Sequence, residues 1–164
     1  MSIIYKPQKE MELFAPFGPT MGYFRMPYEL VEKLNSKMSD KLKSYADNLV
    51  GKVSEELAFD EEILAIAQKG LGQFVGQYQA YTDFRNSMGV KKPDTENFDY
   101  GLQIVSGWFV RQFENEYNPL HIHTGSRLSC VGYLKLPEGI EEEWEEDYKD
   151  HHPANGHIQF AHGT

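Results

Sequence analysis

The chain has 164 residues, of which 40% are hydrophobic and 13% aromatic, and its formal net charge is -9. This much apolar surface can form a buried core, which argues against disorder, and the negative charge disfavours binding to nucleic-acid phosphates. The sequence has no run of about 18 apolar residues and no secretory signal pattern, so neither a membrane span nor export is expected. Cys130 is the only cysteine, which excludes an intrachain disulfide and is typical of the reducing cytoplasm.

The first two predicted elements lie before residue 47. Residues 11–25 alternate apolar and turn-forming residues, which predicts two short strands joined by a turn. After Pro27, apolar residues recur every four positions, which predicts an amphipathic helix over 27–46 with one buried stripe. The stripe consists of Leu30, Leu34, Met38 and Leu42.

A second helix is predicted over 60–86, ending near Gly89. Asp60 suits the N-cap position, and glutamates follow it in the first turn, where negative charge stabilises a helix. The glycines inside this helix have the wrong spacing for a phosphate loop, so we expect them to permit close packing or a kink. The connector 48–57 is expected to hold a short strand or turn, and 90–99 to be a polar loop.

From residue 100 the apolar pattern has a period of two, which indicates strands. One strand is predicted over 100–111, a second over 128–136 and a short last one over 156–162, with a bend at 115–119 and an acidic excursion at 138–155. Helices followed by strands predict one α+β domain over 1–164, in which 1–99 is mainly helical support and 100–164 forms an antiparallel sheet or barrel.

All six histidines lie at or after position 121, so imidazole chemistry is confined to the C-terminal third. His121 and His123 stand two apart, and side chains at i and i+2 of an extended segment point the same way. They can therefore present two ligands to one metal ion, with Ile122 pointing to the opposite side as an anchor. The spacing alone is equally that of two solvated histidines in a loop.

The stretch NPLHIHTGSRLSCVGYLKLP at 118–137 resembles the core motif of a 2-oxoglutarate/iron(II)-dependent oxygenase family common in marine phage and bacteria. The resemblance covers about residues 100–164. It rests on a His-x-His pair, a Ser and a Tyr in the next strand, a Gly-led strand, and an upstream Trp and polar bend. The corresponding residues are His121, His123, Ser129, Tyr133, 155–160, Trp108 and Asn118.

The resemblance implies a double-stranded β-helix, or jelly roll, with the N-terminal helices packed on it. It implies Fe(II) held by His121 and His123, and 2-oxoglutarate as co-substrate near Ser129, Tyr133 and Asn118. Within this chain the predicted third ligand is His162, because it follows the end of a predicted strand. Such a dioxygenase uses O2 to hydroxylate a C–H bond of a small-molecule or peptidyl substrate, here in the cytoplasm of a bacterium or phage-infected host. His123 stands where the usual iron triad has an aspartate, so the site would be more positive.

The family's distal histidine and its basic residue for the 2-oxoglutarate carboxylate lie in further strands that are not found in 1–164. The resemblance therefore implies the first half of a jelly roll with its C-terminal strands missing, and it leaves open whether the chain is active or inactive as it stands. Such a fragment would leave an open sheet edge, which predicts a homodimer.

Two other functions compete with the oxygenase. One is a non-catalytic jelly-roll module with a structural or binding role. The other is a cupin-like metalloprotein whose all-histidine site binds zinc, nickel or iron. The acidic run at 141–147 is expected to be a solvated face, and Cys130 a buried packing residue. Other residues that compete for the third-ligand position are His151, His152 and His157.

Overall fold

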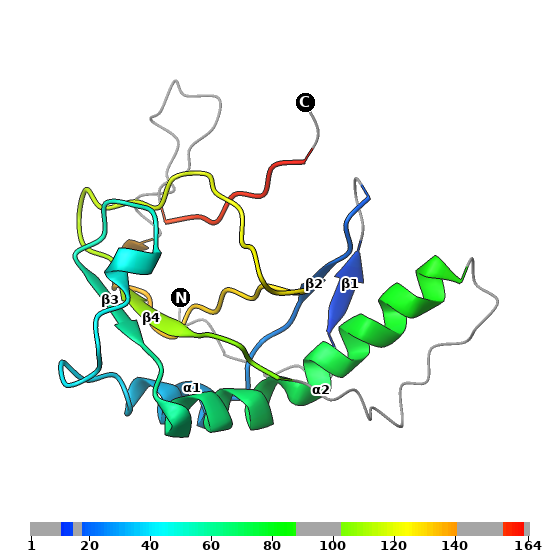
Figure 1. Cartoon of the computed structure of the whole chain (residues 1–164), viewed down its shortest axis with the longest axis horizontal. Helices are drawn as coiled ribbons and strands as arrows, with labels where there is room; N and C mark the ends of the chain where they lie inside the picture. Colours follow the sequence, from blue (N-terminus) through cyan, green and yellow to red (C-terminus); the bar gives the residue numbers. More distant parts are fainter. Residues whose placement is uncertain (1–10, 15–17, 88–102, 141–155, 163–164) are drawn as a thin grey trace. The chain divides into compact units, whose positions relative to one another are not determined.

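The computed structural model describes residues 11–14, 18–87, 103–140 and 156–162 (Figure 1). These residues form a mixture of helices and antiparallel strand pairs, so the mixed α and β class predicted from the sequence is confirmed. The chain divides into two compact units, Met1–Asn118 and Pro119–Thr164. Within the described ranges, no helix combines the length and the apolar character that crossing a membrane requires.

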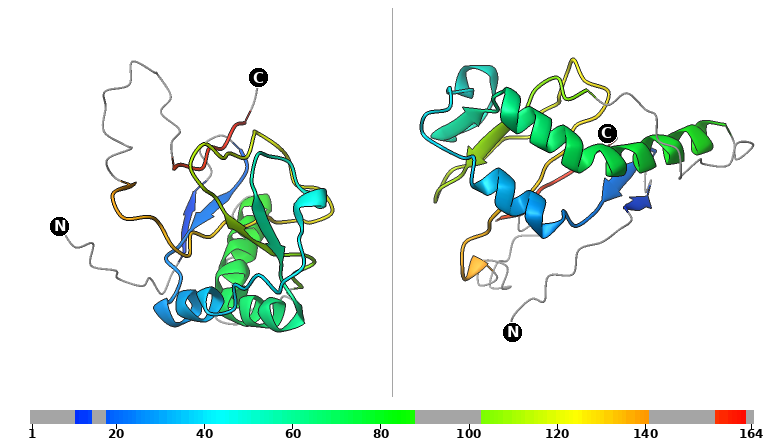
Figure 2. Two further views of the ribbon diagram at one scale, coloured as in Figure 1. Left: turned by 90° about the vertical axis from the view of Figure 1, so that its left-hand side faces the viewer. Right: turned by 90° about the horizontal axis from the view of Figure 1, so that it is seen from below.

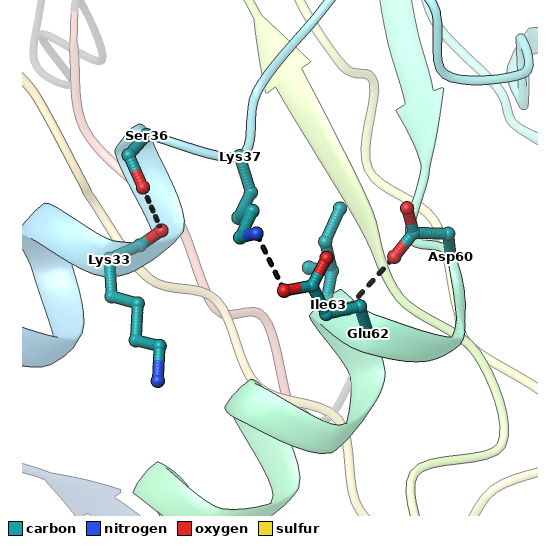
Figure 3. Close-up of polar contacts among 6 residues, drawn as sticks. All are labelled: Lys33, Ser36, Lys37, Asp60, Glu62 and Ile63. Carbon is teal, nitrogen blue, oxygen red and sulfur yellow. Dashed lines mark hydrogen bonds and ion pairs between the residues drawn. The ribbon is translucent and has the colours of Figure 1, made fainter.

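Helix α2, Glu61–Asn86, is the longest element of the first unit. Its start is fixed by Asp60, whose side chain accepts a hydrogen bond of 2.9 Å from the Ile63 N–H and so satisfies one of the unpaired donors at the helix end (Figure 3). The predicted helix and its N-cap are therefore confirmed. One face of α2 is buried, most completely at Ile63, which is 1% exposed.

Helix α1, Tyr28–Asn35, is shorter than the predicted 27–46. Leu30 and Leu34 are buried as expected, but the chain leaves the helix at Ser36, whose hydroxyl donates a 2.8 Å hydrogen bond to the Lys33 carbonyl. Serine competes in this way with the helical hydrogen-bond pattern. The second half of the apolar stripe therefore continues through turns, not through helix.

The end of α1 lies beside the start of α2. Lys37 Nζ and Glu62 Oε1 form an ion pair at 2.6 Å, which Figure 3 shows bridging the two elements. Further along α2, Leu30 of α1 packs directly over Gly70. A methyl group built on Gly70 would lie 2.5 Å from Leu30 Cδ1 and 2.6 Å from Cδ2. The glycine therefore leaves the room that Leu30 occupies, which confirms the close-packing role expected for the α2 glycines at this position.

A hairpin packs on the C-terminal half of α2. Strands β1, Glu12–Phe14, and β2, Met21–Tyr23, pair antiparallel, which confirms the strand-turn-strand prediction for 11–25. The Tyr78 hydroxyl donates to the Thr20 carbonyl at 3.1 Å. The Phe24 and Phe74 rings stack with their centroids 3.8 Å apart.

A second strand pair joins distant parts of the first unit. Strand β3, Glu55–Ala58, pairs antiparallel with β4, Trp108–Arg111, and the short 3-10 helix η1, Ala46–Asn48, precedes β3 (Figures 1 and 2). Phe109 of β4 is buried and packs at a 4.6 Å centroid distance against Phe59. β4 is thus the only part of the predicted 100–111 strand that is a strand among the described residues.

The predicted strands over 128–136 and 156–162 are not found: both segments are described and neither forms a strand. A strand requires ladder hydrogen bonds to a neighbour, and alternating apolar residues alone do not supply that neighbour. Val131, Tyr133 and Leu136 are instead exposed. The jelly roll is not confirmed, and the segments 90–99 and 141–155, for which a loop and an acidic excursion are predicted, lie outside the described residues.

The contact at Gly70 gives a test with a matched control inside the same helix. Gly70→Ala is expected to lower the free energy of unfolding by about 1 kcal/mol, because overpacking against Leu30 exceeds the gain in helix propensity. Gly72→Ala, whose added carbon meets nothing within 4 Å, is expected to raise it by about 0.5–1 kcal/mol. Urea denaturation measures both, and equal effects would contradict the proposed packing.

Glu56 of β3 is a buried acidic residue, only 6% exposed. Burial raises the pKa of its carboxyl above the ordinary 4.5, and the charge on Glu116 raises this pKa further. Glu116 stays ionised because hydrogen bonds from Ser54 and from the Phe113 N–H lower its own pKa. When the pKa of a carboxyl is higher in the folded state than in the unfolded chain, the protein becomes less stable as the pH rises. The reason is that the carboxyl ionises more readily in the unfolded chain, so ionisation favours unfolding.

Ionisation of Glu56 is therefore expected to destabilise the protein. The loss begins as the pH rises above the ordinary pKa of 4.5 and is complete once the pH has passed the raised pKa of the folded state. Glu56→Gln should be more stable than the native chain at pH 8 and equal to it at pH 4. Glu55→Gln is the control, because Glu55 forms a 2.9 Å ion pair with Arg111 and its removal should destabilise slightly. Thermal unfolding at the two pH values measures this, and a Glu56→Gln variant that is less stable at pH 8 would refute it.

Candidate metal centre

The segment that precedes the histidine pair is fixed to the first unit up to residue 117. Asn115 has φ of 61°, in the left-handed region that asparagine tolerates, and makes the turn after β4. Tyr117 then exchanges two backbone hydrogen bonds with Lys52, of 2.8 and 3.1 Å. The predicted bend at 115–119 is therefore confirmed at Asn115, and Pro119 begins the second unit.

His121 and His123 lie together in the second unit. Their Nε2 atoms are 3.2 Å apart, and the two rings meet edge to face with centroids separated by 4.8 Å. Two imidazole nitrogens that each bind one ion at about 2.0–2.1 Å are separated by about 2.9–3.4 Å at octahedral to tetrahedral angles. The two side chains converge as expected, and 3.2 Å matches both a hydrogen bond between the rings and the separation of two ligands on one cation.

The Pro119 carbonyl determines which nitrogen of His121 carries the proton. His121 Nδ1 lies 2.7 Å from this oxygen, and a carbonyl only accepts, so Nδ1–H donates to it. In the neutral ring Nε2 is then left with its lone pair directed at His123. Histidines that bind metals commonly donate their other N–H to a backbone carbonyl in this way. The donor set therefore fits a divalent transition metal, with His123 Nε2–H donating to His121 Nε2 when no metal is bound.

Both imidazoles are exposed, and so are the residues beside them. Leu120 is 76% exposed and Ile122 84% exposed, so the expectation that Ile122 anchors a strand is wrong. The reason is that the segment has no ladder partner, and the side opposite the rings consequently faces solvent. A metal ion held by the pair would remain open to further ligands.

Among the described residues, no group of three His, Cys, Asp or Glu side chains could hold a metal ion. His157 and His162 are both described and exposed, so neither completes a set with His121 and His123 in this structure. His151, His152 and the acidic run at 141–147 lie outside the described residues.

The predicted co-substrate residues belong to different units of the chain. Asn118 belongs to the first unit, where its carboxamide oxygen lies against Gly51. Ser129 is exposed, and Tyr133 is 51% exposed. Partial desolvation raises the pKa of the Tyr133 hydroxyl, so it stays a hydrogen-bond donor at neutral pH.

Cys130 is exposed, which corrects the expectation of a buried packing residue. Residues 128–136 form no strand, so the alternation of side chains between two sheet faces, which was expected to bury Cys130, is absent there. Nearby atoms still desolvate the thiol and raise its pKa, which reduces the thiolate fraction and with it the nucleophilicity.

Comparison with protein families, curated proteins and solved structures finds no match to this chain. The sequence predicts the two imidazoles but not the role of the Pro119 carbonyl, because every residue has a backbone carbonyl and its hydrogen bonds depend on the path of the backbone.

The geometry predicts that each imidazole is needed for metal binding. His121→Ala and His123→Ala should each weaken Fe(II) or Zn²⁺ binding at least 10–100-fold, since loss of even an outer-shell partner costs about that much. Lys135→Ala, an exposed cation of the same unit, is the control and should bind normally. Competition with a chelating dye under anaerobic conditions measures the affinities. Unchanged binding in either histidine variant would refute a two-imidazole site.

Proposed function

We propose that the chain is an iron(II)- and 2-oxoglutarate-dependent oxygenase whose metal is held by His121 and His123. The observation that carries the proposal is the pair of Nε2 atoms 3.2 Å apart, with the His121 tautomer set by the Pro119 carbonyl. The choice of iron and 2-oxoglutarate among the metals and ligands that imidazoles accept comes from the resemblance of 118–137 to the oxygenase motif. The lone cysteine and the need for reduced iron suit the cytoplasm.

The residues of this chain have separate tasks in the proposal. His121 and His123 bind the ion, and the exposure of both rings leaves room for the co-substrate. Tyr133, kept protonated, and Ser129 are proposed to donate hydrogen bonds to a 2-oxoglutarate carboxylate. Bound iron(II), with 2-oxoglutarate and O2, would supply the oxidising chemistry that hydroxylates a C–H bond of a small-molecule or peptidyl substrate.

The proposal includes a jelly-roll arrangement for residues 100–164. Only β4 is a strand in the described part of this region. Segment 128–136 retains the alternating pattern of a strand. A neighbouring strand would supply its ladder hydrogen bonds, and a second layer packed on one face would cover its exposed apolar side chains.

Anaerobic titration of the full chain with Fe(II) and then 2-oxoglutarate tests the function. A weak visible charge-transfer band that needs both additions and is lost in His121→Ala would support it. Tight Zn²⁺ binding without any effect of 2-oxoglutarate would favour an all-histidine metalloprotein instead. Absence of both metal binding and the band would favour a non-catalytic module.

The role of Tyr133 gives a further prediction for the same titration. Tyr133→Phe should weaken 2-oxoglutarate binding by about tenfold, because a hydrogen bond to a charged carboxylate is worth about 1.5 kcal/mol or more. The Fe(II) affinity should stay unchanged, since the hydroxyl is not proposed as a ligand. Unchanged 2-oxoglutarate binding in Tyr133→Phe would refute the proposed role of Tyr133.

A further inference from the structure

The turn that follows β4 is joined to the start of β3 by one carboxylate. Glu116 accepts a hydrogen bond of 3.0 Å from the Ser54 N–H through Oε1 and one of 2.9 Å from the Phe113 N–H through Oε2. Its backbone carbonyl accepts a third, of 2.5 Å, from the Gln112 side chain. An ionised carboxylate accepts such N–H groups more strongly than a neutral carboxyl does, so these contacts require the charge on Glu116.

Glu56 lies two residues after Ser54 and is buried. The neighbouring Glu55 forms an ion pair of 2.9 Å with Arg111 of β4. Because successive side chains of a strand point to opposite faces, Glu56 lies on the other face of the β3–β4 pair. The arginine therefore compensates the charge of Glu55 and not that of Glu56.

The charge that acts on Glu56 comes from the turn. The titratable groups on the elements and segments that pack against β3 are Lys43, Tyr45, Asp47 and Arg111. Burial raises the pKa of the Glu56 carboxyl, and the negative charge of Glu116 raises this pKa further. Hydrogen bonds from Ser54 and Phe113, followed by the charge of Lys52, lower the pKa of Glu116.

We propose that Glu56 is a pH-dependent latch for the turn 112–117, which stays closed on β3 while Glu56 is neutral and opens when Glu56 ionises. Two negative charges repel strongly where burial keeps water from screening them. Glu56 is fixed in a strand between two neighbours, whereas Glu116 is half-buried on a turn. Glu116 is therefore the carboxylate that moves into solvent, and it then gives up the Ser54 and Phe113 N–H groups.

The latch closes over a defined range of pH. The ordinary pKa of both carboxyl groups is 4.5, and the fold lowers that of Glu116 and raises that of Glu56. At pH 4.5 Glu116 is thus mostly ionised and Glu56 mostly neutral, and the turn is closed. Below the lowered pKa the charged acceptor is lost, and above the raised pKa repulsion opens the turn. All of these groups belong to the first unit, so the inference does not rest on the proposed function.

NMR titration of the full chain tests the inference. The Ser54 and Phe113 amide proton signals should move downfield as Glu116 ionises and move back in a second step as Glu56 ionises. Carbon-13 signals of the two carboxyl groups identify the steps. Above the second step, the backbone amides of Lys52 and Tyr117, which are bonded to each other, should lose exchange protection about tenfold.

Three variants assign the steps to residues. Glu56→Gln has nearly the same shape but cannot ionise, so it should keep the first step and lose the second. Glu116→Gln should lose both steps. Glu55→Gln is the matched control on the opposite face of β3 and should keep both.

A second step that survives in Glu56→Gln would overturn the latch. So would a Glu56 carboxyl that titrates in the native chain without moving the two amide signals, and this result decides the question even if a variant fails to fold.

Discussion

Helix α2 is the constraint on which the first unit depends. Helix α1 packs on the N-terminal half of α2 and the β1–β2 hairpin packs on its C-terminal half, so one long helix holds both of these elements, which precede it in the chain (Figure 1). The approach of α1 requires a residue without a side chain, and Gly70 provides it beneath Leu30. Asp60 caps the start of the helix, two residues after β3 ends at Ala58.

The candidate site depends on a different and more local interaction. The carbonyl of Pro119 accepts a hydrogen bond from the Nδ1–H of His121. In the neutral ring, Nε2 therefore keeps a lone pair that can bind a metal. The second imidazole lies at ligand spacing from it. A site built from neighbouring residues of one segment needs little of the surrounding fold to bring its donors together, and this explains how it forms in a segment without strands. The exposure of both rings leaves room for a co-substrate beside a bound ion.

The parts that could be predicted from sequence are those governed by local rules. The Asp60 cap, the long helix and the hairpin follow from residue type and spacing over a few positions, and all three are found. The end of α1 was missed because Ser36 competes with a stripe that continues past it. The strands at 128–136 and 156–162 were predicted from alternation, but a strand also requires a partner, and no local pattern reveals that partner. At the site, the i and i+2 rule located the imidazoles, whereas the Pro119 acceptor and the exposure of Ile122 depend on the path of the backbone.

The central claim is that one cation binds between His121 and His123. Its most direct test is an anomalous difference map, recorded at the iron absorption edge, from crystals of the full chain grown anaerobically with Fe(II). We expect a peak at about 2.1 Å from both Nε2 atoms, with Nδ1 of His121 still donating to the Pro119 carbonyl. Rings that point apart, or a map without density between them, would contradict the account.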